Sequence, residues 1–197
     1  GERGGEPIDG FDMGNSPNEY VESKVRGRKI VFTTTNGTKA MQLCRRARRV
    51  LVGSVVNLSA IVRELREVPR IDLLCAGTHG EVSREDVLAA GWMTHLLLEH
   101  DAELALDDQA LIAQATFRDA NLTLPSASDD DRERCVDKIC EALLDSHGGK
   151  NLIRLNRQGD VRIAADVDSH DLIPELDSGT GTIQAVSGRK STSDGGD

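Results

Sequence analysis

Short apolar runs alternate with amphipathic stretches through the first part of the chain. Residues 29–34, 49–53 and 71–75 are short runs of aliphatic and β-branched side chains, which favour β-strands. Residues 38–47 and 57–67 lie between these runs and repeat apolar positions close to helical spacing. Short apolar strands joined by helices are typical of a sheet that is covered on both faces. The pattern therefore predicts an α/β fold, a three-layer α/β/α arrangement with a mostly parallel sheet.

Longer helical patterns follow. Ser83-Arg84-Glu85-Asp86 resembles a capping box that opens a helix extending to about His100. Residues 107–120 are predicted to form another helix. Residues 131–147 form an amphipathic helix that we expect to be stopped by Gly148-Gly149.

The end of the chain is expected to be less regular. Residues 153–155 and 161–164 are predicted to form a late hairpin or edge strands. Gly, Ser and Thr dominate from Asp177 onward, and such a segment has little apolar surface to bury. We therefore expect one domain over residues 1–176 and a disordered tail over 177–197.

Composition excludes several classes of protein. The 197 residues carry 24 Lys and Arg against 33 Asp and Glu, a net charge of -9, so the basic signature of a nucleic-acid-binding protein is absent. Aromatic residues make up 3% of the chain, too few for a base-stacking platform. No apolar run approaches the roughly 20 residues that cross a bilayer. The four cysteines form no CxxC pair, which predicts reduced thiols and a cytoplasmic protein.

Charge is unevenly distributed. The first 50 residues hold 10 basic and 6 acidic side chains, a balance of +4, and the remainder holds 14 and 27, a balance of -13. An anionic substrate would be attracted to the first segment and repelled elsewhere.

Three predicted strand-to-helix junctions are rich in small and hydroxyl residues. In an open parallel sheet these junctions lie along one edge, where such folds bind ligands. The first junction could seat a phosphate through helix-opening amides and threonine hydroxyls, or could be a tight turn with a threonine cap. The residues concerned are Thr34, Thr35, Asn36, Gly37 and Thr38 in the first junction, Ser54 and Asn57 in the second, and Gly77 and Thr78 in the third.

Acidic side chains offer a second kind of chemistry. Asp9 and Asp12 lie among turn-forming residues, which suits a loop that holds Mg²⁺ and equally suits a solvated Asx turn. Glu85 and Asp86 add carboxylates near the third junction, where acids in a first helical turn are also simply stabilising.

Several of these segments together resemble the 2-phosphosulfolactate phosphatase family. They are GERGG at 1–5, DGFDMGNSP at 9–17, TTTNGT at 33–38, the Gly53-Ser54-x-x-Asn57 junction and CAGTHG with SRED at 75–86, and the resemblance covers about residues 1–176. It implies Mg²⁺-dependent hydrolysis of a phosphate monoester, converting 2-phospho-3-sulfolactate to 3-sulfolactate and phosphate on the way to coenzyme M. Family members also carry an upstream strand with an acidic residue and an Arg, which we expect to lie outside this sequence.

The resemblance implies roles for the candidate residues. Asp12 would hold Mg²⁺ with Asp9, Glu85 or Asp86, and Asp12 and Asp86 would take part in the chemistry. Arg3 would clamp the carboxylate or sulfonate of the substrate. The threonine-rich junction would hold the phosphate, with Ser54, Asn57, Gly77 and Thr78 completing the substrate site. The nucleophile would be water or a carboxylate.

Two other classes stay open at this point. One is an anion-binding module that uses the same loops without turnover. The other is a nucleotide-binding α/β domain, for which the sequence offers no GxGxxG fingerprint. If the chain is a phosphatase, its expected partner is a small phosphate ester, and neither nucleic acid nor a membrane is expected. A homodimer is left open.

Overall fold

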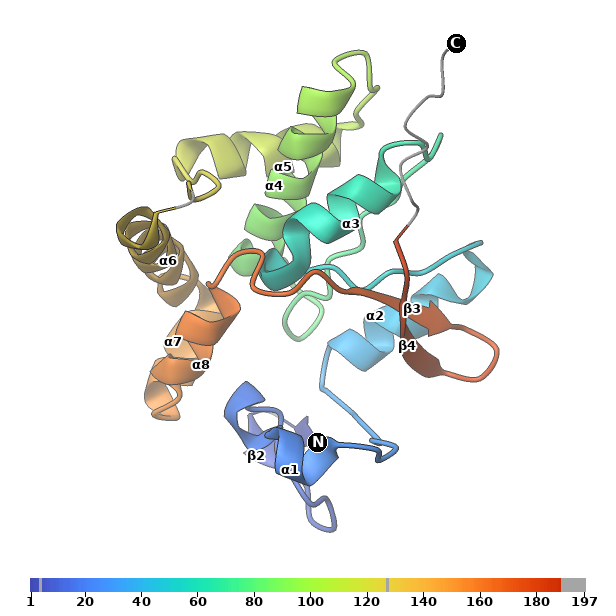
Figure 1. The fold of residues 1–197 in the computed structure, drawn as a ribbon, viewed down its shortest axis with the longest axis vertical. Coiled ribbons are helices and arrows are strands. Elements are labelled where there is room, and N and C mark those ends of the chain that lie inside the picture. Colours follow the sequence, from blue (N-terminus) through green and yellow to red (C-terminus); the bar gives the residue numbers. More distant parts are fainter. Residues whose placement is uncertain (4, 127, 189–197) are drawn as a thin grey trace.

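The computed structural model describes residues 1–3, 5–126 and 128–188 (Figure 1). Eight α-helices and two short antiparallel hairpins occur in this part of the chain. The helices are α1 (Glu22–Val25), α2 (Gly37–Leu43), α3 (Leu58–Leu65), α4 (Arg84–His100), α5 (Asp108–Asp119), α6 (Asp129–Leu144), α7 (His147–Arg154) and α8 (Gln158–Ala164), with 3-10 turns η1 (Pro17–Glu19), η2 (Cys44–Arg46) and η3 (Val55–Asn57). The strands are β1 (Glu2–Arg3), β2 (Glu6–Pro7), β3 (Ile173–Asp177) and β4 (Thr182–Val186).

The mostly parallel sheet that the sequence predicts is not present in the described residues. Residues 29–34, 49–53 and 71–75 are extended but form no parallel ladder, and both sheets are two-stranded and antiparallel. The backbone of residues 50–52 is instead bonded to β3: Leu51 bridges Glu175, the Val52 amide donates to the Pro174 carbonyl, and the Leu176 amide donates to the Val50 carbonyl. Periodicity reports that a segment has an apolar face, but not which neighbour takes its backbone hydrogen bonds.

A charged cluster reinforces this pairing. The guanidinium of Arg49 contacts Glu64 of α3 at 2.7 Å and Glu175 of β3 at 2.7 Å. The hydrogen bonds that Arg49 donates to both carboxylates raise its pKa, and Arg49 therefore stays charged. Because Glu64 is buried, its ion pair with Arg49 is partly shielded from water, and the cluster links α3 to β3.

The helix predictions are largely confirmed. The helix expected after Ser83 is α4, and residues 107–120 contain α5, where the Asp107 side chain accepts a hydrogen bond from the Ala110 amide at 2.8 Å. Residues 38–47 contain α2 and η2, and residues 57–67 contain α3. Helix α5 has a side-chain cap and α3 has an apolar stripe, and both are local properties of the sequence. The capping box expected at Ser83 is not formed, because the Ser83 hydroxyl bonds Glu85 and lies 2.6 Å from the Thr78 hydroxyl instead.

Three predictions for the last fifty residues are wrong. Gly148 and Gly149 do not stop the preceding helix, because α6 ends at Leu144 and both glycines lie in α7, whose first turn is capped by Ser146 at 2.9 Å from the Gly149 amide. Residues 153–155 and 161–164 lie at the end of α7 and in α8 rather than in strands.

The disordered tail predicted from residue 177 contains an ordered strand. Strand β4 pairs with β3 over five residue pairs, from Ile173 with Val186 to Asp177 with Thr182. Backbone pairing therefore orders a segment that has few apolar side chains of its own. Residues 189–197 of the expected tail lie outside the described residues.

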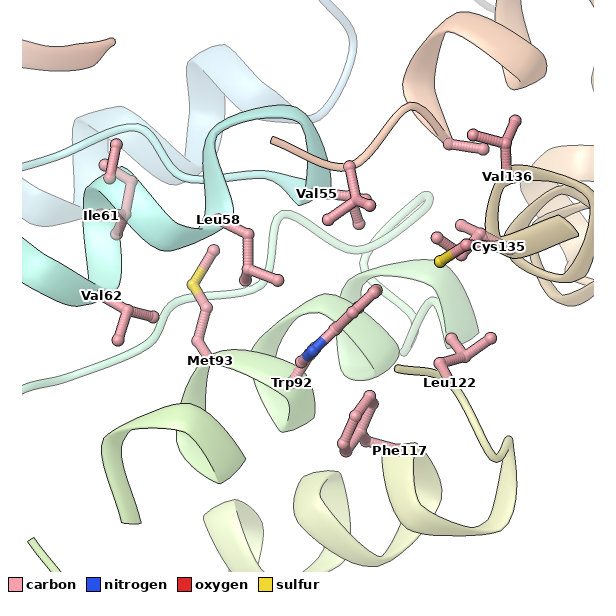
Figure 2. Close-up of a cluster of buried hydrophobic side chains, with 14 of the residues drawn as sticks. Val55, Leu58, Ile61, Val62, Trp92, Met93, Phe117, Leu122, Cys135 and Val136 are labelled. Carbon is pink, nitrogen blue, oxygen red and sulfur yellow. The ribbon is translucent and has the colours of Figure 1, made fainter. Parts of the chain in front are cut away.

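The core lies between α3, α4, α5 and α6. Figure 2 shows Trp92 of α4 between Leu58 of α3 and Phe117 of α5. Trp92 is 2% exposed and stacks on Phe117 with ring centroids 5.3 Å apart. Next to it, Gly91 has no side chain because the Ala113 carbonyl fills that space, so α4 and α5 approach closely. This helical core fixes where α4 begins, and the candidate site lies at that end.

The N-terminal segment packs on the C-terminal helices rather than on this core. In Figure 1 the blue N-terminal segment lies near α7 and α8, and the contacts confirm the neighbourhood. The Glu2 carboxylate forms an ion pair with Arg157 and accepts the Asn15 amide at 2.7 Å. The Ser16 hydroxyl donates to Asp160 of α8 at 2.7 Å. These contacts join the N-terminal segment to the start of α8.

The described helices are all too short or too polar to serve as membrane spans. The four cysteines are free thiols, as predicted.

Replacing Glu2 by Gln should weaken this junction. The side chains of Arg157 and Glu2 are only 22% and 12% exposed, so the charge-assisted bonds are partly shielded from water. We expect Glu2→Gln to lower the free energy of unfolding by about 1–3 kcal/mol, measured by urea denaturation. The matched control is Glu22→Gln, which removes the exposed pair with Arg26 and should cost less than about 1 kcal/mol. Equal losses in the two variants would contradict a special role for Glu2.

Candidate active site

One cavity of about 320 Å³ brings four separate segments together. It is bounded by the N-terminal loop, the threonine-rich loop before α2, the glycine-rich loop near residue 77 and the first turn of α4. The lining residues are Glu2, Gly5, Asn15, Thr34, Thr35, Asn36, Gly37, Ala76, Gly77, Thr78, Ser83, Glu85 and Asp86.

The threonine-rich loop is held mainly by its own side chains. The Thr34 hydroxyl accepts the Thr38 amide at 3.2 Å, and the Thr38 hydroxyl donates to the Thr34 carbonyl at 2.7 Å. The Asn36 side chain accepts the His79 amide at 3.2 Å, which ties the loop to the third junction. Two of the three junctions named from the sequence therefore meet across the cavity.

The third junction is a tight turn whose backbone binds the Asp86 carboxylate. Gly77 has φ +66, and the Glu81 carbonyl occupies the space of a Cβ, so both backbone shape and close approach require glycine. The Gly77 amide donates to Asp86 Oδ2 at 2.7 Å. Burial raises the pKa of Asp86 despite this bond, and the charge of Glu85 raises it further.

Two residues that line this cavity each have a buried oxygen without a hydrogen bond. Among the described residues, neither Asn15 Oδ1 nor Glu85 Oε2 has a hydrogen-bonding partner. Their other atoms are held, since Asn15 Nδ2 donates to the Thr33 carbonyl at 3.2 Å and Glu85 Oε1 accepts from the Ser83 hydroxyl at 3.2 Å. Buried oxygens of this kind call for a cation or a donor.

A magnesium ion fits this donor set. No group of three or more His, Cys, Asp or Glu in the described part of the chain is arranged to hold a metal. Mg²⁺ does not need such a cage, because it keeps several waters and is commonly held by one or two carboxylates plus substrate phosphate. Glu85, Asn15 and Asp86 supply oxygen ligands of the right chemistry at one cavity.

A second cavity of about 420 Å³ adjoins the first and has the opposite charge. Thr34 and Thr35 line both cavities. Among the described residues, the second cavity is lined by the cations Arg3 and Lys39 and by no acidic side chain, whereas the first is lined by Glu2, Glu85 and Asp86 and by no Lys or Arg.

The chain is similar in sequence to known proteins. A family model described as 2-phosphosulpholactate phosphatase matches residues 1–179. The chain belongs to this family. A Symbiobacterium thermophilum protein named "Probable 2-phosphosulfolactate phosphatase" is 34% identical over 180 residues, covering 91% of this chain and 71% of its own length. A Deinococcus radiodurans protein of the same name is 40% identical over 179 residues, covering 89% and 68%.

Most of the predicted site residues meet at the two cavities. Arg3 and Thr38 line the second cavity. Asp9 and Asp12 are exposed and line neither cavity. The residues at the first cavity are Thr34, Thr35, Asn36, Gly37, Gly77, Thr78, Glu85 and Asp86.

The second junction has a local structural role. The Asn57 amide group donates to the carbonyls of Val52 and Leu172, both at 3.1 Å, and its oxygen accepts the Ser54 amide at 2.8 Å. Asn57 thus joins the start of α3 to the segment before β3, and neither it nor Ser54 is among the lining residues of the two cavities described above.

Sequence reasoning missed several lining residues. Asn15 lies inside the DGFDMGNSP segment that was singled out for its acids, so attention to amide oxygens would have found it. Glu2 lies inside the GERGG motif and Lys39 follows the TTTNGT motif directly. Arg157, which holds Glu2, gave no local signal because its partner is 155 residues away.

The pKa values of Asp86 and Asp145 should be shifted in opposite directions from that of an ordinary aspartate. Burial raises the pKa of Asp86, and the Lys150 and Arg84 side chains lower that of Asp145. We expect NMR of the carboxyl carbons in metal-free protein to give a midpoint for Asp86 above the ordinary aspartate value and one for Asp145 below it.

The two shifts have opposite effects on stability. Folded protein binds the Asp86 proton more tightly than unfolded protein does, so this group destabilises the fold as pH rises through its raised pKa. Asp145 contributes stability that is lost as pH falls through its lowered pKa. A midpoint for Asp86 at or below that of Asp145 would show that burial does not control this carboxyl.

Proposed function

We propose that this chain is a phosphatase that hydrolyses 2-phospho-3-sulfolactate, or a related phosphorylated 2-hydroxy acid, with the help of Mg²⁺. The family and the names of its relatives support a phosphoric monoester hydrolase of this kind. The observation that carries the proposal is the pair of adjoining cavities with opposite charge. The free thiols support a cytoplasmic setting.

The acidic cavity is the proposed place for the phosphate and the metal. Three carboxylates would repel a phosphate ester, so a cation must accompany it. Glu85 and Asn15 would hold Mg²⁺ through their unpartnered oxygens, with Asp86 beside them. When bound, Mg²⁺ supplies positive charge to the phosphoryl oxygens as negative charge builds on them. The backbone of Asn36 and Gly37 borders the same space.

The basic cavity is the proposed place for the second acidic part of the substrate. A sulfonate or carboxylate there would lie between Arg3 and Lys39, while the phosphate remains in the neighbouring cavity. Guanidinium binds such groups with two parallel hydrogen bonds. Placing both ends of the substrate would orient the ester bond, which is where most catalysis of phosphate transfer originates.

Asp86 is the proposed proton acceptor. Asp86 lines the acidic cavity, and the Gly77 amide fixes its orientation. A water oxygen bonds to phosphorus, the ester P–O bond breaks, the water proton goes to Asp86, and the released alkoxide takes a proton from solvent.

Phosphate release with and without Mg²⁺ tests the reaction and the metal site. We expect release from 2-phospho-3-sulfolactate only with Mg²⁺, and Glu85→Gln should raise the Mg²⁺ concentration for half-maximal rate by at least about tenfold. Asp12→Asn should have little effect, because Asp12 is exposed and outside both cavities.

The reverse ranking of these variants would move the metal to the Asp9 and Asp12 loop. Binding of substrate without release would instead identify an anion-binding module.

Substitution of Arg3 tests the basic cavity. Loss of a charge-assisted pair worth about 1.5–3 kcal/mol should make Arg3→Ala raise KM for the sulfonated substrate about 10- to 100-fold. KM for a simple phosphate ester should change little. Arg28→Ala is the matched control, since Arg28 is exposed and lines neither cavity. Equal effects of Arg3→Ala on both substrates would reject the clamp.

A further inference from the structure

The Glu85 carboxylate rests on a residue of α7. A Cβ built on Gly148 would overlap Glu85 Oε1 and lie 3.2 Å from its Cδ, so the carboxylate occupies the space that a side chain at this position would need. The Ser83 hydroxyl, which is also 2.6 Å from the Thr78 hydroxyl, bonds the same carboxylate. Gly148 and Ser83 therefore bound Glu85 from two sides.

A neighbouring contact joins the same two elements. Arg84 of α4 pairs with Asp145, which precedes α7, at 2.6 Å. Arg84 and Glu85, which are neighbours in α4, thus contact Asp145 just before α7 and Gly148 in its first turn.

The backbone does not explain a glycine at position 148. Gly148 has no positive φ and lies within a helix, where alanine is the more stabilising residue. Space for the Glu85 carboxylate is the remaining reason for a residue without a side chain.

We propose that Gly148 is a positioning residue for the metal-binding carboxylate. Its bare Cα lets Glu85 lie against α7 with Oε2 at the acidic cavity, and any larger residue would push the carboxylate out of that position. This inference rests on the proposed function, because Glu85 is there the ligand of Mg²⁺.

The test is Mg²⁺ binding to the full chain by isothermal titration calorimetry, with thermal unfolding measured on the same samples. Gly148→Ala should weaken Mg²⁺ binding at least tenfold. Gly159→Ala is the matched control, because Gly159 lies in α8 and a Cβ there meets nothing within 4 Å. The control should bind Mg²⁺ as the unmodified chain does.

A second variant distinguishes positioning from general damage. Glu85→Asp shortens the side chain and makes room for a methyl group at position 148. Adding Gly148→Ala to Glu85→Asp should therefore weaken Mg²⁺ binding less than threefold, far less than the loss from Gly148→Ala alone. This comparison also decides the matter if Gly148→Ala alone does not fold.

Three outcomes would overturn the inference. Unchanged Mg²⁺ binding in Gly148→Ala would reject positioning while leaving the proposed function intact. A tenfold loss from Gly148→Ala in the Glu85→Asp background would show that the effect does not pass through Glu85. Absence of Mg²⁺ binding by the unmodified chain would reject the metal site and this inference together.

Discussion

The candidate active site depends on how the Glu2 carboxylate is held. Glu2 binds the Asn15 amide and pairs with Arg157, which joins the N-terminal loop to the start of α8. That junction helps to place Asn15 at the cavity that Glu85 also lines, although the two residues lie on separate elements. A partly buried, charge-assisted contact is strong enough and directional enough to do this. The site is therefore assembled by the fold rather than carried on one motif.

Electrostatics divides the assembled site in two. The chain has a net charge of -9, and its acidic cavity would exclude a phosphate ester unless a cation entered with it. The adjoining cavity concentrates positive charge from Arg3 and Lys39. Thr34 and Thr35 form a shared wall, and we therefore propose that one substrate with two acidic ends spans both cavities. This division relates the family's chemistry to the unequal charge of the first fifty residues.

Helices and strands were not equally predictable. Helix α3 has an apolar stripe and helix α5 a side-chain cap within their own segments, so local sequence is sufficient for them. Residues 49–53 have the composition of a parallel strand, yet their backbone bonds to β3, more than 120 residues later. Strand β4 becomes ordered by the same distant pairing although its own composition predicts disorder. Gly148 was interpreted as a helix stop, whereas in the structure it lies in α7 against Glu85.

The sequence by itself determined the family, the helical segments, and the hydroxyl-rich and acidic loops from which the site is built. Only the tertiary structure decided that Asn15 rather than Asp12 lines the acidic cavity and that Lys39 lines the basic cavity with Arg3. It also decided that the Asn57 side chain links two backbone segments by hydrogen bonds. The reason is physical: residue type and spacing define what chemistry a loop can perform, but burial and orientation come from contacts between segments far apart in the chain.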